Sequence, residues 1–159
     1  MPVDYPPPSF HFRVVFQMQN VKGVTLRTED AYFQSVSGLN VEMQTESIKE
    51  AGENRFEHVL PARARYPDLV LKRGVLKDSG VVQWCRKAIE YFLVEPINLQ
   101  VQLLDENHMP LIEWHVIHAW PKKWSVSDLN AEQSSLLIET LELNYNFFSV
   151  NHSAPQVNP

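Results

Sequence analysis

The chain has 159 residues, of which 44% are hydrophobic and 21% charged, and its formal net charge is −5. These values exclude an intrinsically disordered protein, and the length suits one domain. Scattered lysines and arginines argue against nucleic-acid binding, a single cysteine excludes an internal disulfide, and no apolar run is long enough to cross a bilayer.

Both ends of the chain are predicted to be arms outside the folded domain. The run Pro6-Pro7-Pro8 favours an extended entry, and the opening MPVDYPPPSF lacks the basic and apolar regions of a secretory signal. The tail from Ser153 to Pro159 is polar and contains prolines. With no signal and no disulfide, we expect a reducing compartment.

Two strands are expected early in the chain. From Phe10 to Phe16 the residues first alternate and then become apolar, which is typical of a strand packed on one face. From Tyr32 to Met43 the apolar residues recur again, and Gly38 interrupts them. A glycine inside a strand commonly marks a bulge or bend, so the pattern predicts a long second strand bent at Gly38.

The segment from Thr45 to Pro67 is polar, mixed in charge and longer than most connections in a compact domain. We interpret it as a long functional loop. The apolar residues between Asp68 and Arg73 then predict a short strand that stops at Gly74.

A helix is predicted from Ser79 to Phe92, capped by Asp78 or Ser79. Its apolar residues recur at helical spacing and make one stripe: Val81, Trp84, Cys85, Ala88, Ile89 and Phe92. The charged residues fall on the solvated face: Arg86, Lys87 and Glu90. Trp84, Ile89 and Phe92 are expected to anchor the helix on the sheet.

Three strands complete the pattern. Leu99, Val101 and Leu103 alternate with polar residues, and a turn over residues 105–108 leads to Ile112, Trp114 and Val116, which indicates an antiparallel hairpin. A last alternating strand carries Leu141, Leu143, Tyr145 and Phe147 and is expected to close the sheet. The sequence therefore predicts a mainly β fold: a single antiparallel β-barrel of about six strands, closed or nearly closed, with one α-helix packed against it.

No catalytic signature is found: there is no Gly-rich phosphate loop, no nucleophile elbow and no metal-binding cysteine pair. Glu113, His115 and His118 are the best metal candidates, but strand residues three apart point to opposite faces, so we interpret the histidines as structural or surface residues. Cys85 lies on the apolar stripe, which favours core packing over nucleophilic chemistry.

An aromatic cluster follows these histidines. Trp114, Trp120 and Trp124, with Pro121, are interpreted as barrel packing in preference to a ligand platform. We expect no catalytic, cofactor-binding or metal-binding residues, no cofactor and no enzymatic activity.

Several segments, taken in order, resemble the phage tail tube family, which also serves contractile injection systems. The matching segments are YPPPSFHFRVVF, FQSVSGLNVEMQTE, LVLKRGVL, INLQVQLLDE, WHVIHAWPKKW and IETLELNYNFF. The resemblance implies a β-barrel like the haemolysin-coregulated protein of type VI secretion, six copies in a ring, and rings stacked into a hollow tube inside a contractile sheath. It also implies assembly in the bacterial cytoplasm into a particle that can be released.

The segments AGENRFEHVLPARARYP and NAEQSS look closer to baseplate-side tube proteins, so both a main-tube subunit and a tube initiator joining spike to tube stay open. The expected partners are other copies of the chain and tube, spike, baseplate and sheath proteins. We expect the stretch from Thr45 to Tyr66 to contact a neighbouring subunit or ring. The alternative is a soluble small-molecule-binding β-barrel, which would be a monomer with a bound ligand.

Overall fold

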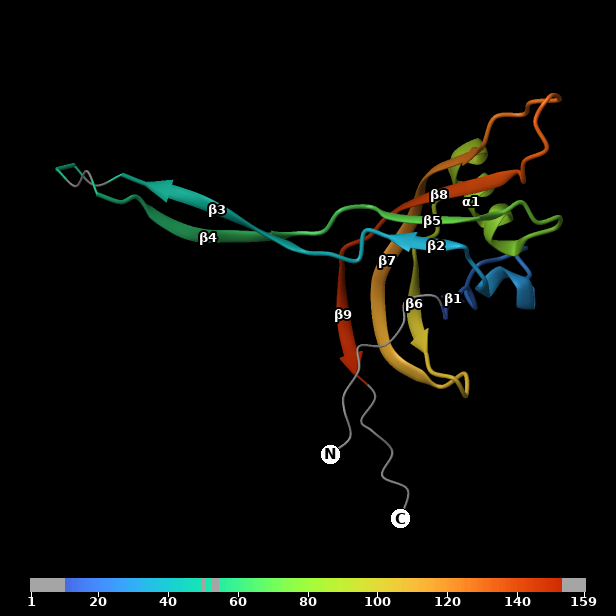
Figure 1. Cartoon of the computed structure of the whole chain (residues 1–159), viewed down its shortest axis with the longest axis horizontal. Helices are drawn as coiled ribbons and strands as arrows, with labels where there is room; N and C mark the ends of the chain where they lie inside the picture. The colour runs from blue at the N-terminus through green and yellow to red at the C-terminus, as the bar shows by residue number, and fades with distance from the viewer. Residues whose placement is uncertain (1–10, 50, 53–54, 153–159) are drawn as a thin grey trace, which may run out of the picture.

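The computed structural model describes residues 11–49, 51–52 and 55–152, and the predicted arms lie outside these residues. In the described residues the chain forms nine strands, one 3₁₀ helix and one α-helix (Figure 1). The strands are β1 (Phe12–Gln17), β2 (Ser35–Ser37), β3 (Glu42–Ile48), β4 (His58–Arg65), β5 (Leu69–Gly74), β6 (Ile97–Leu104), β7 (Pro110–Val126), β8 (Ile138–Asn144) and β9 (Phe147–His152). The helices are the 3₁₀ helix η1 (Thr28–Ala31) and α1 (Gly80–Tyr91).

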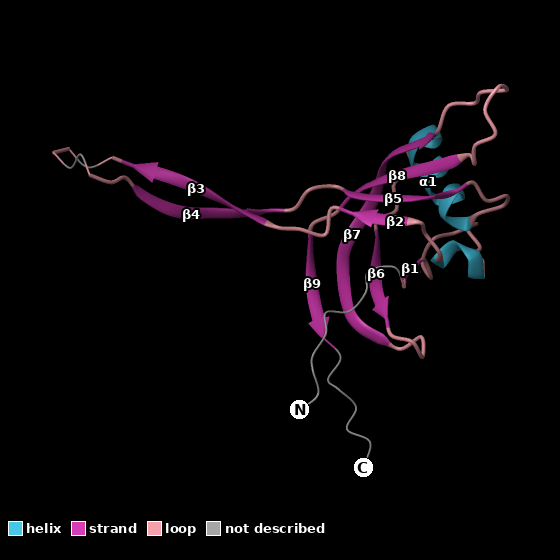
Figure 2. Cartoon of the chain, in the orientation of Figure 1, coloured by secondary structure: helices cyan, strands magenta, loops and turns pink. Residues whose placement is uncertain are grey.

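Seven strands make one antiparallel sheet in the order β1-β6-β7-β8-β5-β2, with β9 paired to β7. The prediction of a mainly β fold with one α-helix is confirmed, but the closed barrel of about six strands is wrong. No backbone pairing joins the end strands β1 and β2 within the described part of the chain, so the sheet stays open. The remaining two strands, β3 and β4, form a separate hairpin that stands clear of the body (Figure 2).

The long strand β7 connects the two halves of the sheet. Its first half pairs with β6 on one edge and β9 on the other, and its second half pairs with β8. Between the halves the register with β6 shifts, and His118 has a φ of 59°. This irregularity bends β7 and folds the sheet around the apolar core.

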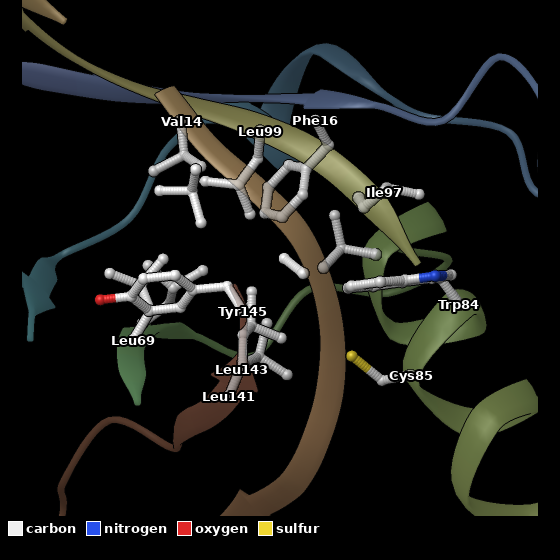
Figure 3. Close-up of a cluster of buried hydrophobic side chains, with 14 of the residues drawn as sticks. Val14, Phe16, Leu69, Trp84, Cys85, Ile97, Leu99, Leu141, Leu143 and Tyr145 are labelled. Atoms are coloured by element: carbon white, nitrogen blue, oxygen red, sulfur yellow. The ribbon is translucent and has the colours of Figure 1, made fainter. Parts of the chain in front are cut away.

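Alternate residues of the strands fill the core (Figure 3). The alternation predicted from Leu99 to Leu103 and from Leu141 to Leu143 is confirmed, because these apolar side chains are buried. The first strand, the short strand after Asp68 and the hairpin of β6 and β7 are also where the sequence predicts them. Within the described residues, these apolar side chains fill the interior of the open sheet.

The predicted helix is confirmed as α1, and Ser79 caps it by accepting a hydrogen bond from the Val82 N–H at 3.3 Å. Val81, Trp84 and Cys85 are almost fully buried against the sheet. The expected anchoring by Ile89 and Phe92 is wrong, since these side chains are 45% and 88% exposed. The helix ends before the stripe does, because Phe92 leaves the helical conformation.

The predicted bent strand from Tyr32 to Met43 and the loop from Thr45 to Pro67 are both wrong. Their residues form the short edge strand β2 and then the hairpin β3–β4, whose described strand residues are all exposed. The bend at Gly38 is correct. Its φ is 96°, and a Cβ there would lie 2.3 Å from the Asp68 carbonyl oxygen, which leaves no room for a side chain.

The last predicted strand is divided in two. Tyr145 and Asn146 interrupt it, and both parts, β8 and β9, pair along β7. The Tyr145 hydroxyl donates to the Gly38 carbonyl at 3.3 Å, which ties this break to the bend before β3. Among the described residues, neither helix has the length and apolar character that a membrane span requires.

Candidate functional site

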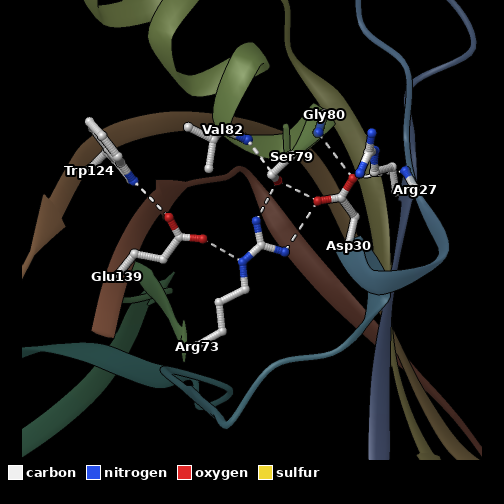
Figure 4. Close-up of polar contacts among 8 residues, drawn as sticks. All are labelled: Arg27, Asp30, Arg73, Ser79, Gly80, Val82, Trp124 and Glu139. Atoms are coloured by element: carbon white, nitrogen blue, oxygen red, sulfur yellow. Dashed lines mark hydrogen bonds and ion pairs between the residues drawn. The ribbon is translucent and has the colours of Figure 1, made fainter. Parts of the chain in front are cut away.

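A buried charge cluster joins five elements of the body at Arg73 (Figure 4). The guanidinium of Arg73 on β5 donates through Nε to Glu139 Oε1 on β8 at 2.5 Å and through Nη1 to Asp30 Oδ1 on η1 at 3.3 Å. It also donates through Nη2 to Ser79 Oγ, the cap of α1, at 2.5 Å. Trp124 on β7 donates to the second Glu139 oxygen at 3.3 Å.

Every charged group of this cluster has a partner. Burial alone would raise the pKa of the Asp30 carboxyl, but hydrogen bonds from the Arg27 N–H, the Ser79 hydroxyl and the Gly80 N–H, with the charge of Arg73, together lower this pKa below its usual value. The cluster therefore locks η1 and the start of α1 onto the sheet.

The sheet face opposite the core is polar where β1, β6 and β7 lie side by side. Arg13 Nε donates to Gln102 Oε1 at 2.5 Å, and the Gln102 amide nitrogen donates to Gln100 and to Glu113, each at 3.1 Å. Glu113 also contacts His115 Nε2 at 3.1 Å. This chain of side chains, the polar face, makes a wettable wall on a rigid sheet.

The β3–β4 hairpin is a second surface, with different faces. Directly paired residues lie on the same face, and the pairs Met43↔Ala64, Thr45↔Pro61 and Ser47↔Val59 contain no charged residue. We call these six residues the charge-free face of the hairpin. The other face contains charged residues, among them the pair Glu42↔Arg65.

The metal candidates of the sequence do not form a site. Glu113 and His115 are in contact on the polar face, whereas His118 lies at the bend of β7, where its backbone N–H donates to Asn98 Oδ1 at 3.0 Å. In the described residues there is no group of three or more His, Cys, Asp or Glu side chains that could hold a metal ion.

The predicted core role of Cys85 is confirmed by its complete burial. Burial is the main cause that raises the pKa of this thiol to about 12, so it is protonated at neutral pH. Trp114 and Trp124 pack against the core from β7, as expected, and Trp124 also holds Glu139. Trp120 is half-buried.

Sequence reasoning missed the Arg73 cluster and the hairpin faces. Asp30, Arg73 and Glu139 are far apart in the chain and carry no motif, and only the two charges at alternating positions of apolar strands could have drawn attention to them. The hairpin gave a weak signal because strands exposed on both faces lack hydrophobic alternation.

An open sheet with a solid core, a hydrogen-bonded polar face and a projecting hairpin suits a structural subunit. The chain belongs to the T4-like virus tail tube protein gp19 family, whose family model matches residues 8–149. It is thus a non-enzymatic tail tube subunit of the class found in contractile phage tails and extracellular contractile injection systems. This membership replaces the alternative of a small-molecule-binding barrel.

Solved structures agree with this family. A chain in the six-fold symmetrised baseplate of the anti-feeding prophage is similar with 28% identity and a TM-score of 0.84, over 94% of this chain and 98% of that one. A chain in the extended sheath–tube complex of the extracellular contractile injection system PVC has 20% identity and a TM-score of 0.77, over 95% of both chains. A type six secretion system protein has 14% identity and a TM-score of 0.56, over 89% of this chain and 83% of that one, and shares the fold. No significant match is found among curated protein sequences.

Proposed function

We propose that six copies of the chain form a ring around a hollow channel, at the baseplate end of the tube of a contractile injection particle. The observation that carries the proposal is the polar face, because a sheet with a solid core on one side can line a water-filled channel with the other. The similar chain of the anti-feeding prophage lies in a six-fold symmetrised baseplate, which supports the ring.

The baseplate position also has support from the degree of likeness. Identity and TM-score are higher for the baseplate chain than for the chain of the PVC sheath–tube complex, at 28% and 0.84 against 20% and 0.77. We therefore favour a tube initiator between spike and main tube. Its partners would be a second copy, a tube protein, a spike protein and a baseplate protein, with the sheath outside the tube.

The β3–β4 hairpin is proposed to contact a neighbouring subunit or ring. Its two strands pair only with each other within the described chain, and all their residues are exposed. A lone two-stranded hairpin is marginally stable in water, so a contact with another copy would stabilise it.

The chain is further proposed to be one domain with an arm at each end, assembled in the bacterial cytoplasm and released within the particle. We assign no catalytic, cofactor-binding or metal-binding residue. Elemental analysis of purified particles should find no stoichiometric metal, and His115→Ala and Cys85→Ser should leave injection by assembled particles unchanged. Loss of injection with normal assembly would point to chemistry at one of these residues.

Electron microscopy and native mass spectrometry of the purified chain at high concentration test the ring. The expected result is six-fold rings with a central channel, and monomers or dimers alone would contradict the proposal. In complete particles, a gold label on the chain should mark one position at the baseplate end. Label along the whole tube would assign the chain to the main tube instead.

A further inference from the structure

The C-terminal end of α1 and the residues after it carry several exposed apolar side chains. Five residues, which we call the helix-end patch, are between 43% and 88% exposed: Ile89, Tyr91, Phe92, Leu93 and Val94. Single exposed apolar residues are ordinary, but five in one short stretch are typical of an interaction surface.

The backbone conformation of Phe92 is a second, independent indication of an interaction surface. Phe92 has φ 57° and ψ 24°, in the left-handed region, and it ends the helix where glycine or asparagine is favoured. A bulky residue in this conformation carries strain, and its ring, at 88% exposure, gains almost no packing in return. An aromatic residue at this position is therefore favoured neither by the end of the helix nor by packing in the core. Contact of its ring with another molecule would account for it.

A polar hollow adjoins the patch. Glu95 Oε2 is buried without a hydrogen-bond partner among the described residues, and the nearest cation, Lys87 Nζ, is 3.8 Å away. Glu95 borders a hollow of about 320 Å³ with several amide side chains around it: Gln17, Gln19, Asn20 and Asn98. A carboxylate beside side-chain amides, whose oxygens accept hydrogen bonds, suits a guanidinium, which only donates them.

The chain itself carries a surface that complements the patch. The charge-free face of the hairpin exposes Met43 and Val59, at 56% and 57%. Arg63 is exposed where the hairpin register shifts, next to Ala64 of that face. The hairpin and α1 lie on opposite sides of the body (Figure 1). Two such surfaces cannot meet within one copy.

We propose that the helix-end patch of one copy receives the charge-free face of the β3–β4 hairpin of a neighbouring copy. The contact is heterologous, since two different surfaces meet, and such contacts close into rings or continue as stacks. The inference rests on the proposed tube function and names the surface on which the hairpin docks.

Mixing two singly substituted chains tests this contact. Met43→Cys and Phe92→Cys chains are assembled together with a short bismaleimide cross-linker, and the native thiol of Cys85 does not react because it is fully buried. Covalent dimers are expected in the mixture and absent from either chain alone. A Glu106→Cys chain, substituted at the exposed turn after β6, replaces Phe92→Cys as the matched control and should give none.

The other outcomes are distinct. Cross-linking of Phe92→Cys with itself would mean that two patches meet each other, and rings without any cross-link would mean that a different protein covers the patch. Both results overturn the inference and leave the tube function intact. Absence of any assembly by the unsubstituted chain would remove the proposed ring and the inference with it.

A second variant separates docking from folding. Phe92→Asn places a favoured residue in the left-handed conformation and removes the aromatic ring. The melting temperature of the free subunit should stay the same or rise, while subunit association weakens roughly tenfold or more, as for an interface hot spot. Unchanged association would overturn the inference.

Discussion

The body and the β3–β4 hairpin are built on opposite principles. In the body, Leu69, Val81 and Val116 are completely buried, and even the charges of Arg73 and Glu139 lie inside with all their partners present. In the hairpin every described strand residue is exposed. The body therefore has the contacts to keep its shape alone, whereas the hairpin, within the described chain, has only its own cross-strand pairs.

The strongest way to break the body is to remove its buried cation. Arg73→Met should lower the free energy of unfolding by about 5 kcal/mol, the upper end for breaking a buried ion pair, because Asp30 and Glu139 both lose a partner. Urea unfolding of the free subunit measures it. Arg86→Ala, which removes an exposed pair with Glu90, is the control and should change little. Equal effects of the two variants would contradict a structural role for the cluster.

The second-largest loss of stability is expected when Trp84, which anchors α1 on the sheet, is truncated. Trp84→Ala should cost about 4 kcal/mol, since Trp84 is 1% exposed and its loss leaves a cavity under α1. Ile89→Ala, on the same helix, should cost about 1 kcal/mol or less. The two melting curves give the comparison, and similar shifts would mean that the buried face of α1 is assigned incorrectly.

Two glycines allow a matched comparison of body and hairpin. Gly38 and Gly52 have φ values of 96° and 97°, but an added Cβ meets the Asp68 carbonyl at 2.3 Å only at Gly38. Gly38→Ala should therefore destabilise the body by about 2 kcal/mol. Gly52→Ala should leave the melting temperature nearly unchanged, because its strain is confined to the hairpin. The reverse order would show that the hairpin is part of the cooperative fold.

Acid should weaken the body through Asp30. The pKa of Asp30 is lowered in the folded protein from the usual 3.8, so its ionised form contributes stability above about pH 3.8. That contribution is lost as pH falls below this value, through the lowered folded pKa. Denaturant unfolding between pH 5 and pH 2 should show a smaller loss in Asp30→Asn, which has no proton to bind there. Parallel curves for the two proteins would exclude Asp30 as a source.

The smallest effect on stability and the largest on assembly are expected at the hairpin. Replacing residues 50–57 with a short turn should leave the unfolding of the body unchanged and impair ring stacking in electron micrographs. A Gly-Ser segment of the same eight residues, as control, keeps the length and removes the side chains. Full-length particles from the shortened chain would mean that the hairpin tip plays no part in stacking.

The same contrast explains what could be predicted from the sequence. Leu99, Val101, Leu141 and Leu143 alternate with polar residues because one sheet face is buried, and this periodicity is visible along the chain. The hairpin has no buried face, so its period carried no information and it resembled a loop. Strands that are exposed on both faces in a single copy have no buried side to impose a period of two on their residues.

Other features depended on contacts between distant segments. The Arg73 cluster joins residues 30, 73, 79 and 139, and no local sequence pattern predicts contacts between residues so far apart. The open sheet was missed for a similar reason, since strand pairing alone decides whether β1 and β2 meet. Helical spacing placed Phe92 on the buried stripe, but the helix ends at Tyr91, so the spacing no longer applies to Phe92. Ile89 lies inside the helix and is nevertheless 45% exposed, which its spacing does not explain.

The bent strand β7 has a further consequence for cooperativity. It is hydrogen-bonded to β6 and β9 in its first half and to β8 in its second, so neither half of the sheet can open without releasing this strand. The backbone amides of both halves should then exchange with solvent in a single large opening event, as one foldon. The hairpin is connected to that foldon by its two strand ends alone and opens separately. In a tube wall made of such subunits, the sheets would therefore stay folded when a hairpin opens.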